Sequence, residues 1–89
     1  MAQQASAALK ILRRKQTEVL SGYSRSTIYL RISQGLWTRP VALGLRAVGW
    51  PAADIEALIA ARIAGRSDHE IRAIVRTLES DRLATGAQR

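Results

Sequence analysis

Four side chains able to make hydrogen bonds crowd the start of a predicted short helix. Within the stretch S-G-Y-S-R-S-T-I-Y-L-R-I-S-Q-G (21–35) they are Ser24, Arg25, Ser26 and Thr27. Serine and threonine are mediocre helix formers, so their presence here needs a reason. One reason is capping, in which the Ser24 hydroxyl accepts a hydrogen bond from the backbone N–H of Ser26 or Thr27. Capping explains Ser24 but not its three neighbours, which suit contact with something outside the protein's own core.

The chemistry of this group fits a nucleic acid. A guanidinium such as that of Arg25 can donate two hydrogen bonds to O6 and N7 of guanine, while Ser26 and Thr27 can donate, accept or contact a thymine methyl group. The free N–H groups at a helix N-terminus also attract phosphate. We therefore interpret this first turn as a segment that enters a major groove, with capping alone as the alternative.

The net charge of +7 lies in the first part of the chain. Residues 1–50 carry eight lysines and arginines against Glu18 alone, whereas residues 51–89 carry six arginines and six acidic residues. A basic surface beside a neutral one is the distribution expected of a protein that binds polyanions. A charge that only keeps the protein soluble does not require this asymmetry.

The composition argues against several kinds of site. The 89 residues include no cysteine and one histidine, His69, so disulfides and thiolate metal sites are excluded. No nucleophile–base pair, carboxylate pair or phosphate-binding loop is visible, and we expect no enzymatic activity, no cofactor and no small-molecule substrate. Neither a secretory signal nor an apolar run of about 20 residues is present. We therefore expect a cytoplasmic protein that does not contact a membrane.

The sequence around the polar group predicts a helix-turn-helix. A first helix over about 15–21 is expected to turn Val19 and Leu20 inward. The second helix has Ile28 and Ile32 one turn apart, which gives it a buried stripe. Two helices joined by a glycine-containing turn, the second with a polar front end, are typical of this motif.

A β-hairpin is predicted directly after the second helix. The segment V-A-L-G-L-R-A-V-G-W (41–50) is apolar and is interrupted by Gly44-Leu45-Arg46. This pattern indicates two short strands around a tight turn, with Arg46 near the tip, in the position of a wing. Arg39 and Arg46 flank the wing, where a guanidinium can enter a minor groove or hold a phosphate. Either arginine could instead be solvated.

Two further helices complete the predicted fold. The third has apolar residues at helical spacing, namely Ile55, Leu58, Ile59 and Ile63. A capping box from Ser67 to Glu70 begins the fourth. The apolar face of the fourth helix comprises Ile71, Ile74, Val75 and Leu78. This face either folds back and enlarges the core or docks a neighbouring copy of the chain.

The predicted fold class is mainly α with a small β-hairpin, a winged helix-turn-helix plus an additional C-terminal helix. We expect a disordered N-terminus at 1–8 and the winged helix-turn-helix DNA-binding domain at 9–65. A C-terminal helix at 66–84 serves packing or self-association, and a frayed tail follows at 85–89.

The remaining candidates lie around the second helix. Tyr29 either donates a hydrogen bond to phosphate or packs partly under the wing, and Arg31 is expected to meet the DNA backbone rather than the bases. Trp37 and Trp50 bracket the wing and are predicted to be structural. The predicted DNA-binding residues are therefore Ser24, Arg25, Ser26, Thr27, Tyr29, Arg31, Arg39 and Arg46.

Residues 16–63 resemble the AlpA-type regulators, small winged helix-turn-helix proteins related to the MerR-like DNA-binding domain and to phage excisionases. The resemblance rests on four segments in order, S-G-Y-S-R-S-T-I-Y, Q-G-L-W-T-R-P-V-A-L-G, R-A-V-G-W-P and D-I-E-A-L-I. The chain departs from the family's usual S-T-I-Y-R-L-I by exchanging Leu30 and Arg31, and it has Trp37 where phenylalanine is usual.

This resemblance implies a sequence-specific DNA-binding protein that acts as an excisionase, or recombination directionality factor, of an integrated mobile element. Several copies would bind adjacent sites on double-stranded DNA near an attachment site and help a tyrosine integrase favour excision. The alternative is a transcriptional regulator of integrase or excision genes. Either would reside in a bacterial cytoplasm, at the nucleoid when bound. A third alternative, from the charge alone, is a basic module that binds an acidic protein partner.

Overall fold

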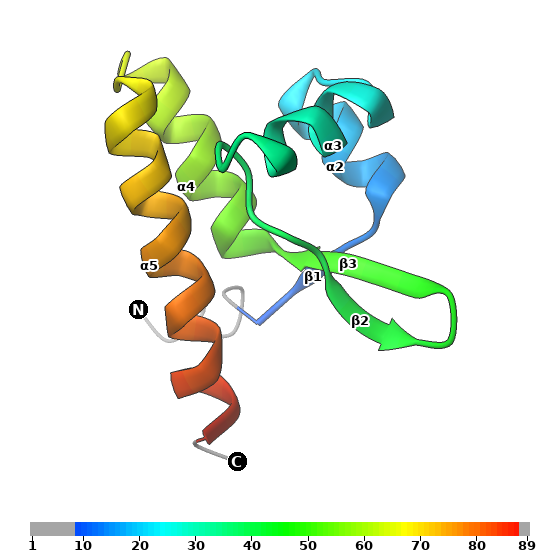
Figure 1. Cartoon of the computed structure of the whole chain (residues 1–89). Coiled ribbons are helices and arrows are strands. Elements are labelled where there is room, and N and C mark those ends of the chain that lie inside the picture. The colour runs from blue at the N-terminus through cyan, green and yellow to red at the C-terminus, as the bar shows by residue number, and fades with distance from the viewer. Residues whose placement is uncertain (1–8, 88–89) are drawn as a thin grey trace.

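The computed structural model describes residues 9–87 of the chain (Figure 1). The predicted disordered segment at 1–8 lies outside the described residues, as do residues 88 and 89 of the predicted tail. The predicted fold class is confirmed, since the fold is mainly helical with a small antiparallel sheet and a C-terminal helix. The elements are β1 (Ile11–Leu12), α2 (Arg14–Ser21), α3 (Arg25–Ser33), β2 (Val41–Gly44), β3 (Ala47–Pro51), α4 (Ala52–Ile63) and α5 (Asp68–Ala87).

Helices α2 and α3 form the helix-turn-helix. α2 ends at Ser21 and is followed by Gly22, whose φ of 77° lies in the left-handed region that glycine enters without steric cost. Ser24 caps the start of α3, since its hydroxyl oxygen accepts from the Thr27 backbone N–H at 3.2 Å, as predicted. Ile28 is fully buried and Ile32 packs against the core, so the predicted buried stripe of α3 is confirmed.

The buried face of α2 is not the one predicted. Val19 and Leu20 are 82% and 56% exposed, whereas Thr17 is fully buried. Arg14 and Ser21, which lie one turn to either side of Thr17, are partly buried on the face that packs against α3, α4 and β3. The Thr17 hydroxyl donates to the carbonyl one turn earlier at 3.1 Å, which satisfies it within the helix. The prediction was wrong because apolarity does not define the inward face of so short a helix.

The wing is a hairpin of β2 and β3, and β1 adds a third strand in the order β1-β3-β2. β1 is antiparallel to β3, with Leu12 opposite Trp50. The strands approach so closely at Gly49 that a Cβ there would lie 2.5 Å from Ile11 Cγ2 and 2.9 Å from the Leu12 carbonyl oxygen. Arg46 lies in the tight turn, as predicted, and the hairpin projects away from the helices on the side opposite α5 (Figure 1).

Helix α5 folds back beside α4 and runs in the opposite direction (Figure 1). The predicted capping box begins it, since Ser67 N–H donates to Glu70 Oε1 at 2.9 Å and Glu70 N–H donates to Ser67 Oγ at 3.2 Å. Ile71 and Val75 are buried, 1% and 5% exposed, and Ile74 and Leu78 pack against the same core. Of the two uses predicted for this apolar face, the structure therefore has packing on the domain itself.

A buried ion pair also holds α5 in place. Arg82 donates to one carboxylate oxygen of Asp54 from Nε at 3.2 Å and from a terminal NH₂ group at 2.7 Å. Asp54 is 5% exposed. Burial raises the pKa of the Asp54 carboxyl above its ordinary value, although the hydrogen bonds and charge of Arg82 oppose the increase.

The core joins the wing to the helices around Trp50. Its side chain is fully buried and its indole N–H donates to the Thr38 carbonyl at 2.8 Å. Trp37, 3% exposed, belongs to the same cluster, so the structural role predicted for both tryptophans is confirmed. Of the apolar residues at helical spacing in α4, Ile55 and Leu58 are buried but Ile63 is 82% exposed, because the buried stripe follows Leu58 and Ala61 and leaves the end of the last turn in solvent.

Candidate nucleic-acid interface

The start of α3 presents three side chains on one outward face. Arg25, Ser26 and Tyr29 line an open hollow there, while Ile28 between them is buried and anchors the helix. Neither the Arg25 guanidinium nor the Ser26 hydroxyl forms a hydrogen bond or ion pair with the described residues. Both groups are therefore free to bind an external partner.

Ser24 and Thr27 act together at the helix start. Besides accepting from the Thr27 N–H, the Ser24 hydroxyl donates to Thr27 Oγ1 at 3.0 Å. Capping therefore involves both residues, and not Ser24 alone as was predicted. Contact of Ser24 and Thr27 with DNA stays a prediction. Of the four polar residues at the start of α3, Arg25 and Ser26 have side chains that form no hydrogen bond with the described residues.

Tyr29 connects α3 to the wing. Its ring meets that of Trp50 edge-on, with centroids 6.4 Å apart, and 39% of the residue remains exposed beside Arg25 and Ser26. The two alternatives considered for Tyr29, packing under the wing and contact with phosphate, are thus compatible in this geometry. Packing fixes the ring while part of its surface stays on the outward face.

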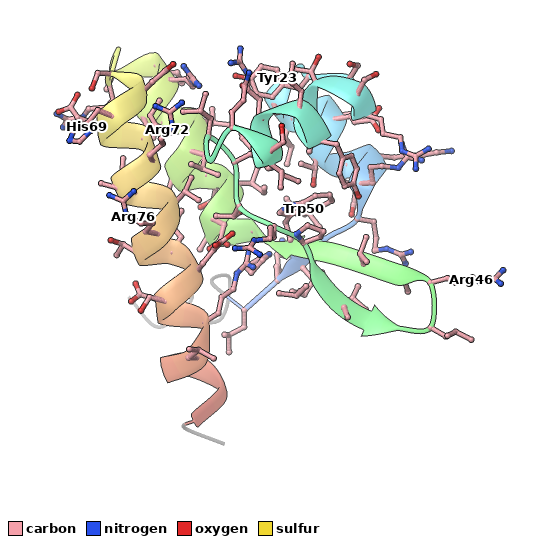
Figure 2. All side chains as sticks on the ribbon, in the orientation of Figure 1. Tyr23, Arg46, Trp50, His69, Arg72 and Arg76 are labelled. Carbon is pink, nitrogen blue, oxygen red and sulfur yellow. The ribbon has the colours of Figure 1, made fainter. Side chains whose placement is uncertain are left out.

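The second exposed cation is at the wing tip. Figure 2 shows Arg46 extending away from the body of the molecule, and it has no bond to any described residue. Its φ is 63°, and Arg46 is the only residue other than glycine in the described part of the chain with a positive φ. This conformation costs roughly 1 kcal/mol for a side chain with a Cβ. A strained arginine at an exposed tip suggests that the side chain is retained for contact.

Two predicted residues lie apart from this face. The Arg31 guanidinium lies over the Tyr23 ring, 5.8 Å from its centroid, and contacts Gln34 Oε1 at 3.4 Å. The Arg39 main-chain N–H donates to Glu79 Oε2 at 2.8 Å, and its guanidinium lies 3.8 Å from the same oxygen. Arg39 therefore belongs to the surface around α5, so the structure does not bring the predicted set together as one patch.

The cations at the start of α2 have mixed environments. Arg13 donates from Nε to the Val48 carbonyl at 3.0 Å and so ties this helix to the wing. Sequence reasoning missed this positioning role, because the partner is 35 residues away and is a main-chain group that no side-chain pattern reveals. Arg14 pairs with Glu18, while Lys15 is exposed and has no bond to the described chain.

Within residues 9–87, no cluster of three or more His, Cys, Asp or Glu side chains could hold a metal ion. No helix in the described part of the chain combines the length and apolarity needed to cross a membrane.

The fold and its exposed cations define the class of protein. A helix-turn-helix with Arg25 and Ser26 free at the front of its second helix, followed by a hairpin with Arg46 at its tip, is a winged helix-turn-helix of the DNA-binding type. Residues 10–63 match the family described as "Prophage CP4-57 regulatory protein (AlpA)". This match covers more than half of the chain, which therefore belongs to this family.

A phage protein gives a second comparison. The chain is 42% identical over 57 residues to "Uncharacterized protein ORF88" of Enterobacteria phage P4. The aligned segment covers 64% of this chain and 65% of the phage protein, which is just under two thirds of its length. No solved structure matches the chain. The family match runs from β1 to the end of α4, so α5 lies outside it.

Proposed function

We propose that this protein is an excisionase, or recombination directionality factor, of an integrated mobile element. Copies of the chain bind adjacent sites near an attachment site, bend or coat the DNA, and help a tyrosine integrase favour excision. The outward face of Arg25, Ser26 and Tyr29 supports the DNA contact, and the prophage family and the phage relative support the link to a mobile element.

The exposed groups suggest how DNA is read. With α3 in a major groove, the Arg25 guanidinium reaches O6 and N7 of guanine, and the Ser26 hydroxyl reaches a neighbouring base edge or a phosphate. Arg46 contacts the adjacent minor groove or a phosphate, as wing cations can. In this arrangement α3 supplies the sequence preference and the wing adds charge-dependent affinity.

The size of the interface favours several copies. One short helix and one hairpin form a single DNA-binding module, and such modules bury roughly 600–1,000 Å² of protein surface. Adjacent copies held on one DNA molecule gain affinity through their high effective concentration. We therefore expect clustered sites, with self-association on DNA.

The alternative is a transcriptional regulator, an activator or repressor of integrase or excision genes. The words "regulatory protein" in the family description favour it. The two roles use the same surface of α3 and the wing, so the location of the binding sites distinguishes them.

The test is genomic footprinting in the source cell, combined with a count of excised elements. Excisionase activity predicts clustered sites at the attachment site and excision that requires both this protein and the integrase. Expression of Arg25→Ala at the same level provides the control and should reduce both signals. Sites confined to promoters, with excision unchanged when the protein is absent, would reject the excisionase proposal in favour of the regulator.

A further inference from the structure

A second hollow lies on the side of the molecule that faces away from the wing tip. It is enclosed by the end of α3, the segment that follows it and one face of α5, and it has a volume of about 180 Å³. Small-molecule sites usually have volumes of roughly 300–1,000 Å³, so this hollow has room for a side chain rather than a cofactor. The lining residues are Ile32, Gly35, Trp37, Arg39, Arg72, Val75, Arg76 and Glu79.

The charge of this hollow is not balanced. Three arginines and one glutamate line it. Glu79 is occupied by Arg39, through the main-chain N–H at 2.8 Å and the guanidinium at 3.8 Å. The guanidinium of Arg76 forms no bond with the described residues, which leaves its charge available to an external anion.

Arg72, which also lines the hollow, is held in place by a hydrogen bond to the main chain. Its Nε donates to the Gln34 carbonyl at 2.9 Å, and its aliphatic stem lies over Gly35. This bond fixes the plane of the guanidinium and leaves its two NH₂ groups without a partner in the described part of the chain. A positioned guanidinium favours the two parallel hydrogen bonds with which arginine binds a carboxylate.

The floor of the hollow is apolar but has one unused donor. Ile32 and Val75 contribute aliphatic surface. Trp37 is 3% exposed, and its indole N–H has no acceptor among the described residues. Since buried indole N–H groups usually find a partner, an acceptor carried into the hollow would complete the bonding of Trp37.

We propose that this hollow docks an acidic segment of a partner protein. One carboxylate of that segment lies against Arg72 and Arg76, and an adjacent apolar side chain packs on Val75 and Ile32. Figure 2 shows Arg72 and Arg76 on α5, far from Arg46 at the wing tip, so DNA and the acidic segment bind on separate faces. The inference holds whether the protein acts as an excisionase or as a transcriptional regulator.

The test follows the two indole N–H signals of the full chain by nuclear magnetic resonance, at fixed ionic strength. The probe is a blocked peptide of sequence D-E-L-D-E, with N-Q-L-N-Q as its uncharged match. We expect D-E-L-D-E to shift the Trp37 signal saturably and to leave that of Trp50, which is already bonded to Thr38, unchanged. The uncharged peptide should have no effect.

Matched variants separate the hollow from general basic charge. Arg76→Ala should weaken peptide binding about 10-fold or more and leave DNA affinity within about twofold. Arg46→Ala removes the same charge from the wing and should leave peptide binding unchanged. Melting curves of both variants check that the fold is retained.

Three results would overturn the proposal. The first is a Trp37 signal that D-E-L-D-E does not move. The second is equal weakening of peptide binding by Arg46→Ala and Arg76→Ala, which would mean that only net charge matters. The third is self-association that occurs without peptide and that Arg76→Ala abolishes, because the occupant would then be a second copy of this chain.

Discussion

The arginines on the two sides of the molecule differ in what surrounds them. On α3 and the wing, Arg25 and Arg46 form no bond with the described residues. On the side of α4 and α5, most arginines have an acidic partner in the protein, in the pairs Arg39–Glu79, Arg62–Asp68, Arg66–Glu70 and Arg82–Asp54. The two sides therefore differ in the share of arginines that have an acidic partner: Arg25 and Arg46 have none, whereas on the α5 side Arg72 and Arg76 are the exceptions among the described residues.

This difference affects how readily each arginine binds phosphate. A paired guanidinium must give up its acidic partner before it can neutralise a DNA phosphate, whereas a free one displaces only water. Exposed ion pairs contribute about 0–1 kcal/mol to stability, so a pair such as Arg66–Glu70 does little for the fold by itself, unlike the buried pair of Arg82 and Asp54. We expect the larger consequence to be that this side competes weakly for DNA.

The largest effect is expected where the α5 side supports the fold. Ile71→Ala should lower the free energy of unfolding by about 2–5 kcal/mol, because Ile71 is 1% exposed and its loss leaves a cavity between α5 and the core. Urea denaturation measures the change. The control is Ile63→Ala at an 82% exposed position, which should change stability by less than about 0.5 kcal/mol. Similar values for the two variants would contradict the packing of α5.

Loss of a base contact on α3 is expected to have the next largest effect. Arg25→Ala should reduce discrimination between the target site and a site with one changed guanine by about 1–3 kcal/mol. Competition binding with the two DNA duplexes measures it. Arg66→Ala, which removes an exposed arginine paired with Glu70 on the other side, is the control and should preserve discrimination. If Arg25→Ala instead weakens binding equally on all sequences, Arg25 contacts phosphate rather than base.

Two substitutions at the wing tip separate contact from conformation. Arg46→Gly and Arg46→Ala should weaken DNA binding to the same extent, since both remove the guanidinium. Their stabilities should differ by roughly 1 kcal/mol in favour of glycine, because the φ of 63° is strained for alanine but not for glycine. Thermal melting and DNA titration of the pair provide the two measurements. Unequal DNA affinities would show that turn geometry, not charge, determines the contribution of the wing.

A smaller effect is expected from the buried pair that holds α5. The pKa of Asp54 is raised above 3.8 by burial, so the folded state binds its proton more readily than the unfolded state. As the pH rises from below 3.8 through the raised value, the wild type should lose stability relative to Asp54→Asn, which does not titrate there. Urea denaturation of both proteins across this range tests the direction. A difference that grows with pH would mean that Arg82 outweighs burial.

The sequence predicted the elements better than the inward face of each one. Ser24, the turn at Arg46 and the capping box at Glu70 were predictable because local chemistry determines them. Val19 and Leu20 were predicted to face inward but are exposed, and Ile63, which continues the apolar spacing of α4, is exposed as well. The faces that these short or terminal segments bury are determined by packing against distant elements, which a local pattern does not contain.

The candidate site was predictable from the sequence only where local chemistry determines the position of a residue. Arg25 and Ser26 follow directly from the start of α3, and Arg46 from the hairpin. The placement of Arg31 over Tyr23 and of Arg39 beside Glu79 depends on tertiary contacts, the second across 40 residues of sequence. Sequence position near the wing therefore did not reveal the side of the molecule on which Arg39 lies.

The salt dependence of DNA affinity tests the division into two sides most directly. Each phosphate contact contributes about 0.9 to the slope of log K against log salt on duplex DNA. We expect the double variant Arg25→Ala, Arg46→Ala to bind more weakly and to lose up to about 2 from that slope, according to how many of the two contact phosphate. The double variant Arg72→Ala, Arg76→Ala removes the same charge and should match the wild type. A wild-type affinity independent of salt, or an equal loss of slope in both double variants, would contradict the assignment of DNA binding to α3 and the wing.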